Sequence, residues 1–284
     1  MEQEPELTEG YQYTRTRYDR FIAKTKAHWY AAVEPRLLRL ARFLHESEYQ
    51  DTSEKPLISI MMPTFKRGQL LIDRTLPSIL AQTYQNFEVI IVGDRRIDNT
   101  EKLIQNLNHP KVHFYHRAEY THYPKDVKAR WHVGGGPQRN RGLSLSRGKW
   151  IAELDDDDIF TPDHLETLLS HAQKNNLEFV SSSNVMRRRG VDYVVDSGWE
   201  TPLVGGISTW LYRSYLTFFR YNMDSWRKGY NRPQDYDRAM RMYKAGARTG
   251  FIKKVLAYSY PVPGSGLTSV GLDAIEERTG LKLR

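Results

Sequence analysis

The sequence contains no cysteine, which excludes disulfide bonds and metal sites built from thiolates. It has no apolar run long enough to span a bilayer, and its acidic first six residues do not form a signal-peptide pattern. Without an export signal, we expect a cytoplasmic protein that acts in solution or at the inner face of a membrane. Charged residues at 27% and hydrophobic residues at 39% are typical of a globular chain.

The charge balance favours anionic partners. Forty-two Lys and Arg residues against 34 Asp and Glu residues give a net charge of +8. Nucleotides, phosphorylated lipids, acidic glycans and nucleic acid all satisfy this preference, so charge alone does not choose among them.

Residues 1–56 are predicted to be a helical extension followed by a linker. The apolar pattern is helical over 11–44, and Pro35 is expected to divide it into two helices, while the polar stretch 46–56 is typical of a linker. Segment 11–44 carries eight Lys or Arg residues and an apolar face. It is therefore predicted to lie on an anionic membrane, to mediate self-association or to pack on the rest of the chain. We favour packing, because one stripe resembles core: Leu37, Leu40, Ala41 and Leu44.

From residue 57 onward, strands alternate with helices, which predicts an α/β fold. The expected sheet is mixed and mostly parallel, with helices on both faces, as in Rossmann-like folds. We expect one domain over 57–284, with a nucleotide-binding half over 57–183 and an acceptor half over 184–284. The predicted strands are 57–62, 87–92, 112–116, 150–154, 179–183 and 249–255, the helices are 70–82, 99–107, 137–145, 163–175 and 233–245, and 185–232 is irregular.

Four consecutive carboxylates, Asp155 to Asp158, follow the apolar strand predicted over 150–154. Adjacent negative charges repel each other, and a hard divalent cation such as Mn²⁺ or Mg²⁺ relieves that repulsion through oxygen ligands. The alternative is a solvated acidic turn before the helix that begins near Asp163.

Three sequence blocks resemble the family-2 glycosyltransferases with the GT-A fold. The first is ISIMMPTFKR at 58–67, continued by LPSILAQTYQNFEVIIVGD at 76–94; the second is RNRGLSLSRGKW leading to LDDDD, over 139–158; the third is PQDYD at 233–237. The resemblance covers about residues 57–256 in the right order and spacing. Two departures from the family pattern are Lys66, where Asn is usual, and Gly93, where Asp is usual.

This resemblance implies a nucleotide-sugar donor, most often UDP-linked. Asp155 and Asp157 match the metal- and phosphate-binding D-x-D pattern, with Asp156 between them. Arg130 and Asn140 are further donor-binding candidates. The base would be framed by Pro63, Thr64, Phe65 and Asp94, although Asp94 beside a glycine is also an ordinary turn residue.

Asp235 is the predicted catalytic base. The resemblance implies that it removes the proton of the acceptor hydroxyl, whereas the alternative is a carboxylate that only stabilises the start of a helix. Gln234 replaces the family's usual Glu, and Asp237 is expected to play a supporting part.

The sequence therefore predicts a metal-dependent inverting glycosyltransferase that acts on a glycan, lipid or small-molecule acceptor, with no nucleic-acid partner. One alternative is an inactive basic module that binds glycans or nucleic acid through the aromatic stretch 210–232. Another is a sugar-phosphate nucleotidylyltransferase, although the G-x-G-x-R loop of that class is absent after the first strand.

Overall fold

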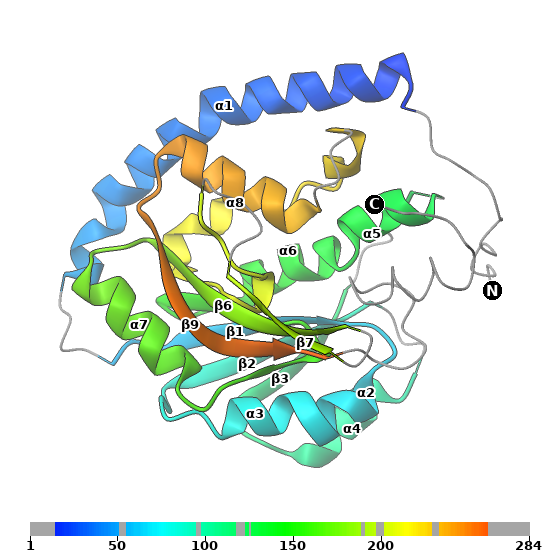
Figure 1. Cartoon of the computed structure of the whole chain (residues 1–284), viewed down its shortest axis with the longest axis vertical. Helices are drawn as coiled ribbons and strands as arrows, with labels where there is room; N and C mark the ends of the chain where they lie inside the picture. Colours follow the sequence, from blue (N-terminus) through cyan, green and yellow to red (C-terminus); the bar gives the residue numbers. More distant parts are fainter. Residues whose placement is uncertain are drawn as a thin grey trace.

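A central mixed sheet organises the molecule (Figure 1). The computed structural model describes residues 15–50, 55–94, 98–117, 123–124, 126–188, 191–196, 202–228 and 233–260. Within them the strand order is β3-β2-β1-β4-β8-β6-β9-β5, and β7 pairs with β6. The strands are β1 (Ile58–Thr64), β2 (Phe87–Gly93), β3 (Val112–His116), β4 (Trp150–Glu153), β5 (Asp158–Phe160), β6 (Phe179–Arg188), β7 (Val191–Val195), β8 (Leu211–Arg213) and β9 (Thr249–Ser259).

Helices cover both faces of this sheet, as the sequence predicts (Figure 1). Strands β3, β2, β1 and β4 run parallel, and β8 joins β4 to β6 by antiparallel pairing. The α-helices are α1 (Arg17–His45), α2 (Gly68–Leu70), α3 (Leu76–Leu80), α4 (Thr100–Leu107), α5 (Val127–Val133), α6 (Gly136–Leu145), α7 (His164–Lys174) and α8 (Gln234–Ala245). A π-helical turn, η2 (Leu71–Thr75), joins α2 to α3, and the 3₁₀ turns are η1 (Glu46–Tyr49), η3 (Ile207–Thr209), η4 (Ser214–Phe218) and η5 (Ser225–Lys228).

The alternation of side chains along the strands divides the core into two layers. On β1, Ile60 and Met62 face the layer that contains α3, α4 and α7, whereas Met61 faces α6, α8 and α1. Every residue of β1 and β2 is buried, which explains why both strands appear in the sequence as nearly continuous apolar runs.

The predicted break at Pro35 is wrong, because α1 is one helix from Arg17 to His45. Proline removes one backbone donor, but the turns on either side of it are held by tertiary contacts. Glu34 forms an ion pair with Arg241 of α8, and Leu38 is buried. The helix curves along the top of the molecule in Figure 1 instead of breaking.

The stripe predicted as core in the extension is also wrong. Leu40 and Leu44 are exposed, and Leu38 points inward in their place. The orientation of α1 is fixed by polar contacts with the rest of the domain. They include the ion pairs Asp19–Arg227 and Arg42–Glu178. These pairs turn much of the apolar stripe toward solvent.

Two segments predicted as irregular are more ordered than expected. Within 46–56, η1 carries the buried Tyr49, whose hydroxyl donates to the Lys149 carbonyl oxygen at 2.7 Å. Within 185–232, β8 lies inside the sheet, and β6 continues as far as Arg188. Three-residue strands such as β8 and β5 are too short for sequence periodicity to reveal.

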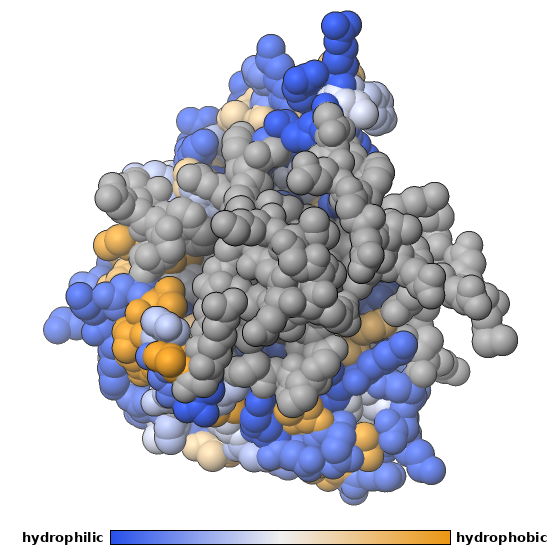
Figure 2. Space-filling model, turned by 45° about the vertical axis from the view of Figure 1, so that its right-hand side comes forward, coloured by the Kyte–Doolittle hydropathy of each residue, from blue (hydrophilic) through white to orange (hydrophobic). Residues whose placement is uncertain are grey.

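The molecular surface in Figure 2 is largely hydrophilic where the structure describes it, including the top, where α1 begins. None of the described helices has the length and apolar character needed to cross a membrane.

Candidate active site

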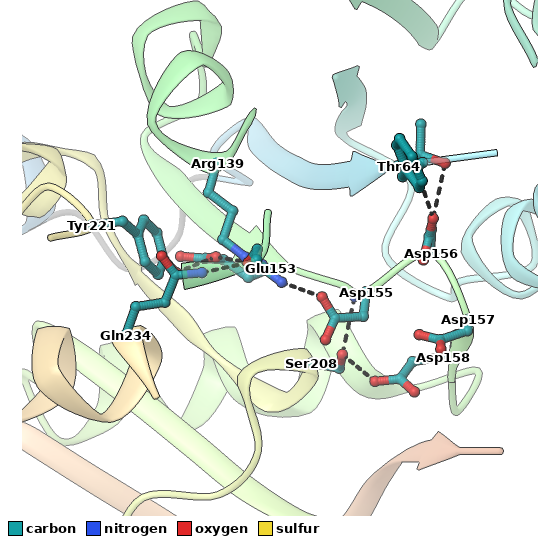
Figure 3. Close-up of polar contacts among 12 residues, drawn as sticks. Thr64, Arg139, Glu153, Asp155, Asp156, Asp157, Asp158, Ser208, Tyr221 and Gln234 are labelled. Carbon is teal, nitrogen blue, oxygen red and sulfur yellow. Dashed lines mark hydrogen bonds and ion pairs between the residues drawn. The ribbon is translucent and has the colours of Figure 1, made fainter. Parts of the chain in front are cut away.

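The acidic run lies at the carboxyl end of β4, beside the end of its parallel neighbour β1. In open α/β sheets this edge is where ligands bind. Figure 3 shows these carboxylates pointing in different directions: Asp156 points to Thr64 at the end of β1, Asp155 points to Arg139, and Asp158 points to Ser208. The local fold therefore gives each carboxylate a different environment.

Asp156 and Asp157 both form ion pairs with the Arg67 guanidinium. Thr64 Oγ1 donates to Asp156 Oδ2 at 2.9 Å, and Arg67 Nη1 lies 2.5 Å from Asp156 Oδ1 and 2.9 Å from Asp157 Oδ2. Lys66 has a positive φ of 55°, in the left-handed region, where Asn is more readily accommodated than Lys. The turn after β1 thus brings Arg67 over the acidic run.

Asp155 and Asp158 have different partners. Arg139 of α6 forms ion pairs with both Asp155 and Glu153. Ser208 of η3 donates its hydroxyl to Asp158 and accepts the Asp155 N–H at 3.1 Å. The sequence alone assigns no role to Arg139, whereas the structure places it in direct contact with the acidic run.

Burial disfavours the ionised forms of three carboxylates in the acidic run. Burial, followed by the neighbouring Asp156 charge, raises the pKa of Asp157 to about 7. Burial also raises the pKa of Asp156, and it raises the pKa of Asp158 well above its usual range. Each shift reports a carboxylate whose ionised form is poorly compensated. An additional cation would stabilise the ionised forms of these carboxylates.

The donor atoms fit a hard divalent ion that completes its coordination with phosphate. Among the described residues, no three His, Cys, Asp or Glu side chains gather closely enough to hold a metal by themselves. Mg²⁺ and similar ions at phosphate sites use one or two carboxylates together with substrate oxygens and water. Asp155 and Asp157 can supply that number.

Asp235 occupies the first turn of α8, near enough to the acidic run for the Asp155 charge to act on it. Burial raises its pKa to about 6, the Arg139 charge lowers the pKa, and the Asp155 charge raises it. No ion pair joins Asp235 to a described residue, whereas Asp237 in the same turn pairs with both Lys228 and Arg241. The two carboxylates in the first turn of α8 thus differ, because ion pairs neutralise Asp237 and none to a described residue neutralises Asp235.

The glycine turn before α6 lies next to the start of α8. Gly135 has a φ of 73°, and a Cβ built there would contact Pro63 at 3.5 Å. Gln234 is buried and donates to the Gly134 carbonyl oxygen at 2.5 Å, while its Oε1 atom has no partner in the described part of the chain. The glycine turn therefore contacts both the end of β1 and Gln234, the neighbour of Asp235.

Of the remaining predicted residues, Phe65 contacts the acidic run, and Asp94, Arg130 and Asn140 have other partners. Asp94 pairs with Arg117 at 2.7 Å, and Arg130 donates to the Pro124 carbonyl oxygen at 3.2 Å. Asn140 exchanges two hydrogen bonds with the Tyr221 backbone, at 2.8 and 2.9 Å. Phe65 donates its backbone N–H to Asp156 at 3.3 Å. Their roles in donor binding stay predictions.

Sequence reasoning missed the buried network beneath the site. Glu153 on β4 is fully buried and pairs with Arg139 at 3.2 Å and Arg238 at 2.6 Å. It also accepts the hydroxyls of Tyr212 at 2.6 Å and Tyr221 at 2.5 Å. A carboxylate inside an otherwise apolar strand was the available signal, because a buried charge needs partners.

Comparison with known proteins identifies the family. The family model described as "Glycosyl transferase family 2" matches residues 59–247, which include the acidic run and Asp235. The chain belongs to this family. The resemblance inferred from the three sequence blocks is thus confirmed.

Two curated relatives match less than half of this chain. A glycosyl transferase of Escherichia coli strain K12, WcaA, whose name refers to colanic acid biosynthesis, is 36% identical over 121 residues, covering 42% of this chain and 39% of the relative. The E. coli protein WfgD, named as a UDP-Glc:alpha-D-GlcNAc-diphosphoundecaprenol beta-1,3-glucosyltransferase, is 31% identical over 124 residues, covering 44% of each. The matches therefore span less than half the length of these relatives.

Solved structures confirm the GT-A fold. TarS of S. aureus in complex with UDP-GlcNAc superposes with a TM-score of 0.59 at 17% identity, covering 75% of this chain and 60% of TarS. The mannosyltransferase PcManGT from Pyrobaculum calidifontis, in complex with GDP-Man and Mn²⁺, gives a TM-score of 0.53 at 18% identity, covering 87% and 69%. At these identities the likeness concerns the fold.

Proposed function

We propose that the protein transfers a sugar from a nucleotide diphosphate sugar, with UDP as the nucleotide, to an acceptor hydroxyl. The observation that carries this proposal is the undercompensated acidic run at the end of β4 within a family-2 domain. Family membership favours glycosyl transfer over nucleotidyl transfer. The Asp235 carboxylate beside the run favours an enzyme over a module that only binds.

The donor site is assigned to the end of β1 and to the acidic run. Pro63, Thr64, Phe65 and Asp94 would frame the base, while Asp155, Asp157 and Arg139 lie where the diphosphate is expected. Mn²⁺ or Mg²⁺ held by Asp155 and Asp157 would neutralise charge on the leaving diphosphate. Arg67 forms ion pairs with Asp156 and Asp157, so we expect its side chain to move when the metal and donor bind.

Asp235 takes the proton from the acceptor hydroxyl. The acceptor oxygen then forms a bond to the anomeric carbon while the bond from that carbon to the phosphate oxygen breaks. The electron pair leaves with the nucleoside diphosphate, and the anomeric configuration inverts. A raised pKa of about 6 suits this task, because the carboxylate is ionised at neutral pH and is more basic than an exposed Asp.

The acceptor is proposed to be a sugar hydroxyl on a lipid-linked glycan. This extension is supported by the name of the relative WfgD, which specifies a diphosphoundecaprenol-linked acceptor. Residues 184–284 are proposed as the acceptor half of the domain, and 57–183 as the donor half.

A screen of nucleotide sugars tests the proposal. We expect one donor to be consumed, with release of its nucleoside diphosphate, in the presence of Mn²⁺ or Mg²⁺ and not after chelation. Asp235→Asn is the matched control, because it should bind the same donor without turning it over. If no nucleotide sugar is consumed and none raises the melting temperature, the proposed activity is wrong.

A further inference from the structure

The outward face of α1 carries an unusual number of exposed large apolar side chains. Phe43 is 85% exposed, Phe21 65% and Trp29 56%. With Tyr18, Leu40 and Leu44 they follow helical spacing and form one stripe along the helix. We call this stripe the outer face of α1.

The exposed surface of α1 carries cations and no acidic residue. The acidic residues of α1 are Asp19 and Glu34, and both are buried against the domain, where they pair with Arg227 and Arg241. The exposed surface of the helix therefore has one sign of charge. Its exposed cations without an ion pair to any described residue are Arg17, Arg20, Lys24, Arg36 and Arg39.

We propose that the outer face of α1 docks the protein on an anionic lipid bilayer. Aromatic and Leu side chains would enter the interface between headgroups and acyl chains, while the long Lys and Arg side chains reach anionic headgroups. A second copy of the chain fits less well, because a two-fold contact would bring two cationic faces together with no acidic residue to offset them. The charge pattern therefore selects lipid as the partner.

The position of α1 places this surface near the acceptor side. Lys26 pairs with Asp224 at 2.5 Å, just before η5, and Lys228 within η5 pairs with Asp237 in the first turn of α8, which also carries Asp235. Figure 1 shows α1 and α8 side by side, with their first turns at the same end. A bilayer beneath α1 would thus lie alongside the end of the domain that holds the base candidate. The docking itself requires no donor or metal, so it can fail or succeed independently of the proposed activity.

Co-sedimentation of the full chain with vesicles tests the docking. We expect binding to mixed phosphatidylglycerol–phosphatidylcholine vesicles, weakening as salt is added, and little binding to phosphatidylcholine alone. Phe21→Ser with Phe43→Ser should weaken binding about 10- to 100-fold per residue lost. Lys24→Glu, Arg36→Glu and Arg39→Glu together should weaken it at least about 100-fold, because each cation near an anionic surface contributes about 5-fold.

Two control variants carry the same kinds of change elsewhere. Val191→Ser with Val194→Ser alters exposed apolar residues of β7, and Lys102→Glu with Lys174→Glu alters exposed cations of α4 and α7. Both should bind vesicles as the wild type does. The proposal is overturned if the wild type does not bind anionic vesicles, if it binds neutral ones equally, or if the α1 variants bind unchanged. It is also overturned if those variants instead convert a dimer to a monomer in sedimentation velocity.

Discussion

Two groups of carboxylates on neighbouring elements differ in how completely their charge is matched. Glu153 and Asp237 are buried, and each contacts two cationic side chains. Asp157 shares Arg67 with Asp156, and Asp235 has no ion pair to a described residue. Cationic side chains of the protein neutralise Glu153 and Asp237, whereas the charges of Asp157 and Asp235 are compensated less completely. A bound ligand could supply the missing positive charge.

The difference separates structural charge from functional charge. A buried carboxylate with two cations contributes to the fold and is destabilising to remove. A buried carboxylate whose pKa rises to about 6 or 7 instead costs stability while it is ionised, and such groups concentrate at functional sites. This contrast distinguishes Asp235 from Asp237, two residues of the same helix, better than sequence position does.

The largest expected effect is on turnover. Asp235→Asn should reduce kcat by roughly 10²–10⁴-fold with unchanged UDP affinity, because it removes the base and keeps the shape. Asp237→Asn should keep turnover within a few-fold and lower stability. Steady-state kinetics and calorimetry measure both. If Asp237→Asn loses turnover and Asp235→Asn keeps it, the base has been assigned to the wrong carboxylate.

Removing the matched carboxylate beneath the site should destabilise the fold. Glu153→Gln leaves Arg238 buried without its counter-charge, and we expect a loss of about 3–5 kcal/mol in the free energy of unfolding. Asp163→Asn, which breaks an exposed pair with Lys254, is the control and should cost about 0–1 kcal/mol. Urea unfolding compares the two variants. Equal losses would show that the buried Glu153 ion pairs contribute no more to the free energy of unfolding than an exposed pair does.

The pH profile should report the unmatched carboxylate on α8. Because burial raises the pKa of Asp235 to about 6, the ionised base is lost as pH falls through 6. We expect kcat/KM to decrease about tenfold per pH unit below that value and to level off above it. A flat profile between pH 5 and pH 7, measured with saturating metal, would argue against Asp235 as the base.

The smallest expected effect is a gain in stability from removing an unmatched charge. Burial and the Asp156 charge raise the pKa of Asp157 to about 7. At a pH above the ordinary Asp pKa, this shift lowers the free energy of unfolding, because the folded state disfavours the ionised carboxylate. Asp157→Asn should therefore stabilise the metal-free protein by about 0.5–1 kcal/mol at pH 8. Thermal unfolding in chelator measures it. A clear loss of stability would place Asp157 with the structural carboxylates instead.

The sequence was sufficient for the fold class and for the position of the acidic run after β4. Apolar runs such as β1 and β2 are long and buried on both faces, so their composition alone identifies them. The placement of α1 was not predictable, because its buried face is set by ion pairs to Arg227 and Arg241, more than 180 residues later in the chain. The roles of Arg67 and Arg139 were hidden for the same reason: long-range partners decide them.

The central claim is that the acidic run is left undercompensated in order to bind a divalent cation together with a nucleotide diphosphate. Calorimetric titration of UDP into the wild type and into Asp157→Asn, each with Mn²⁺ and with chelator, tests it most directly. The account predicts UDP binding by the wild type that depends on Mn²⁺, and loss of that dependence in a folded Asp157→Asn protein. Equal UDP affinity in all four titrations would contradict it.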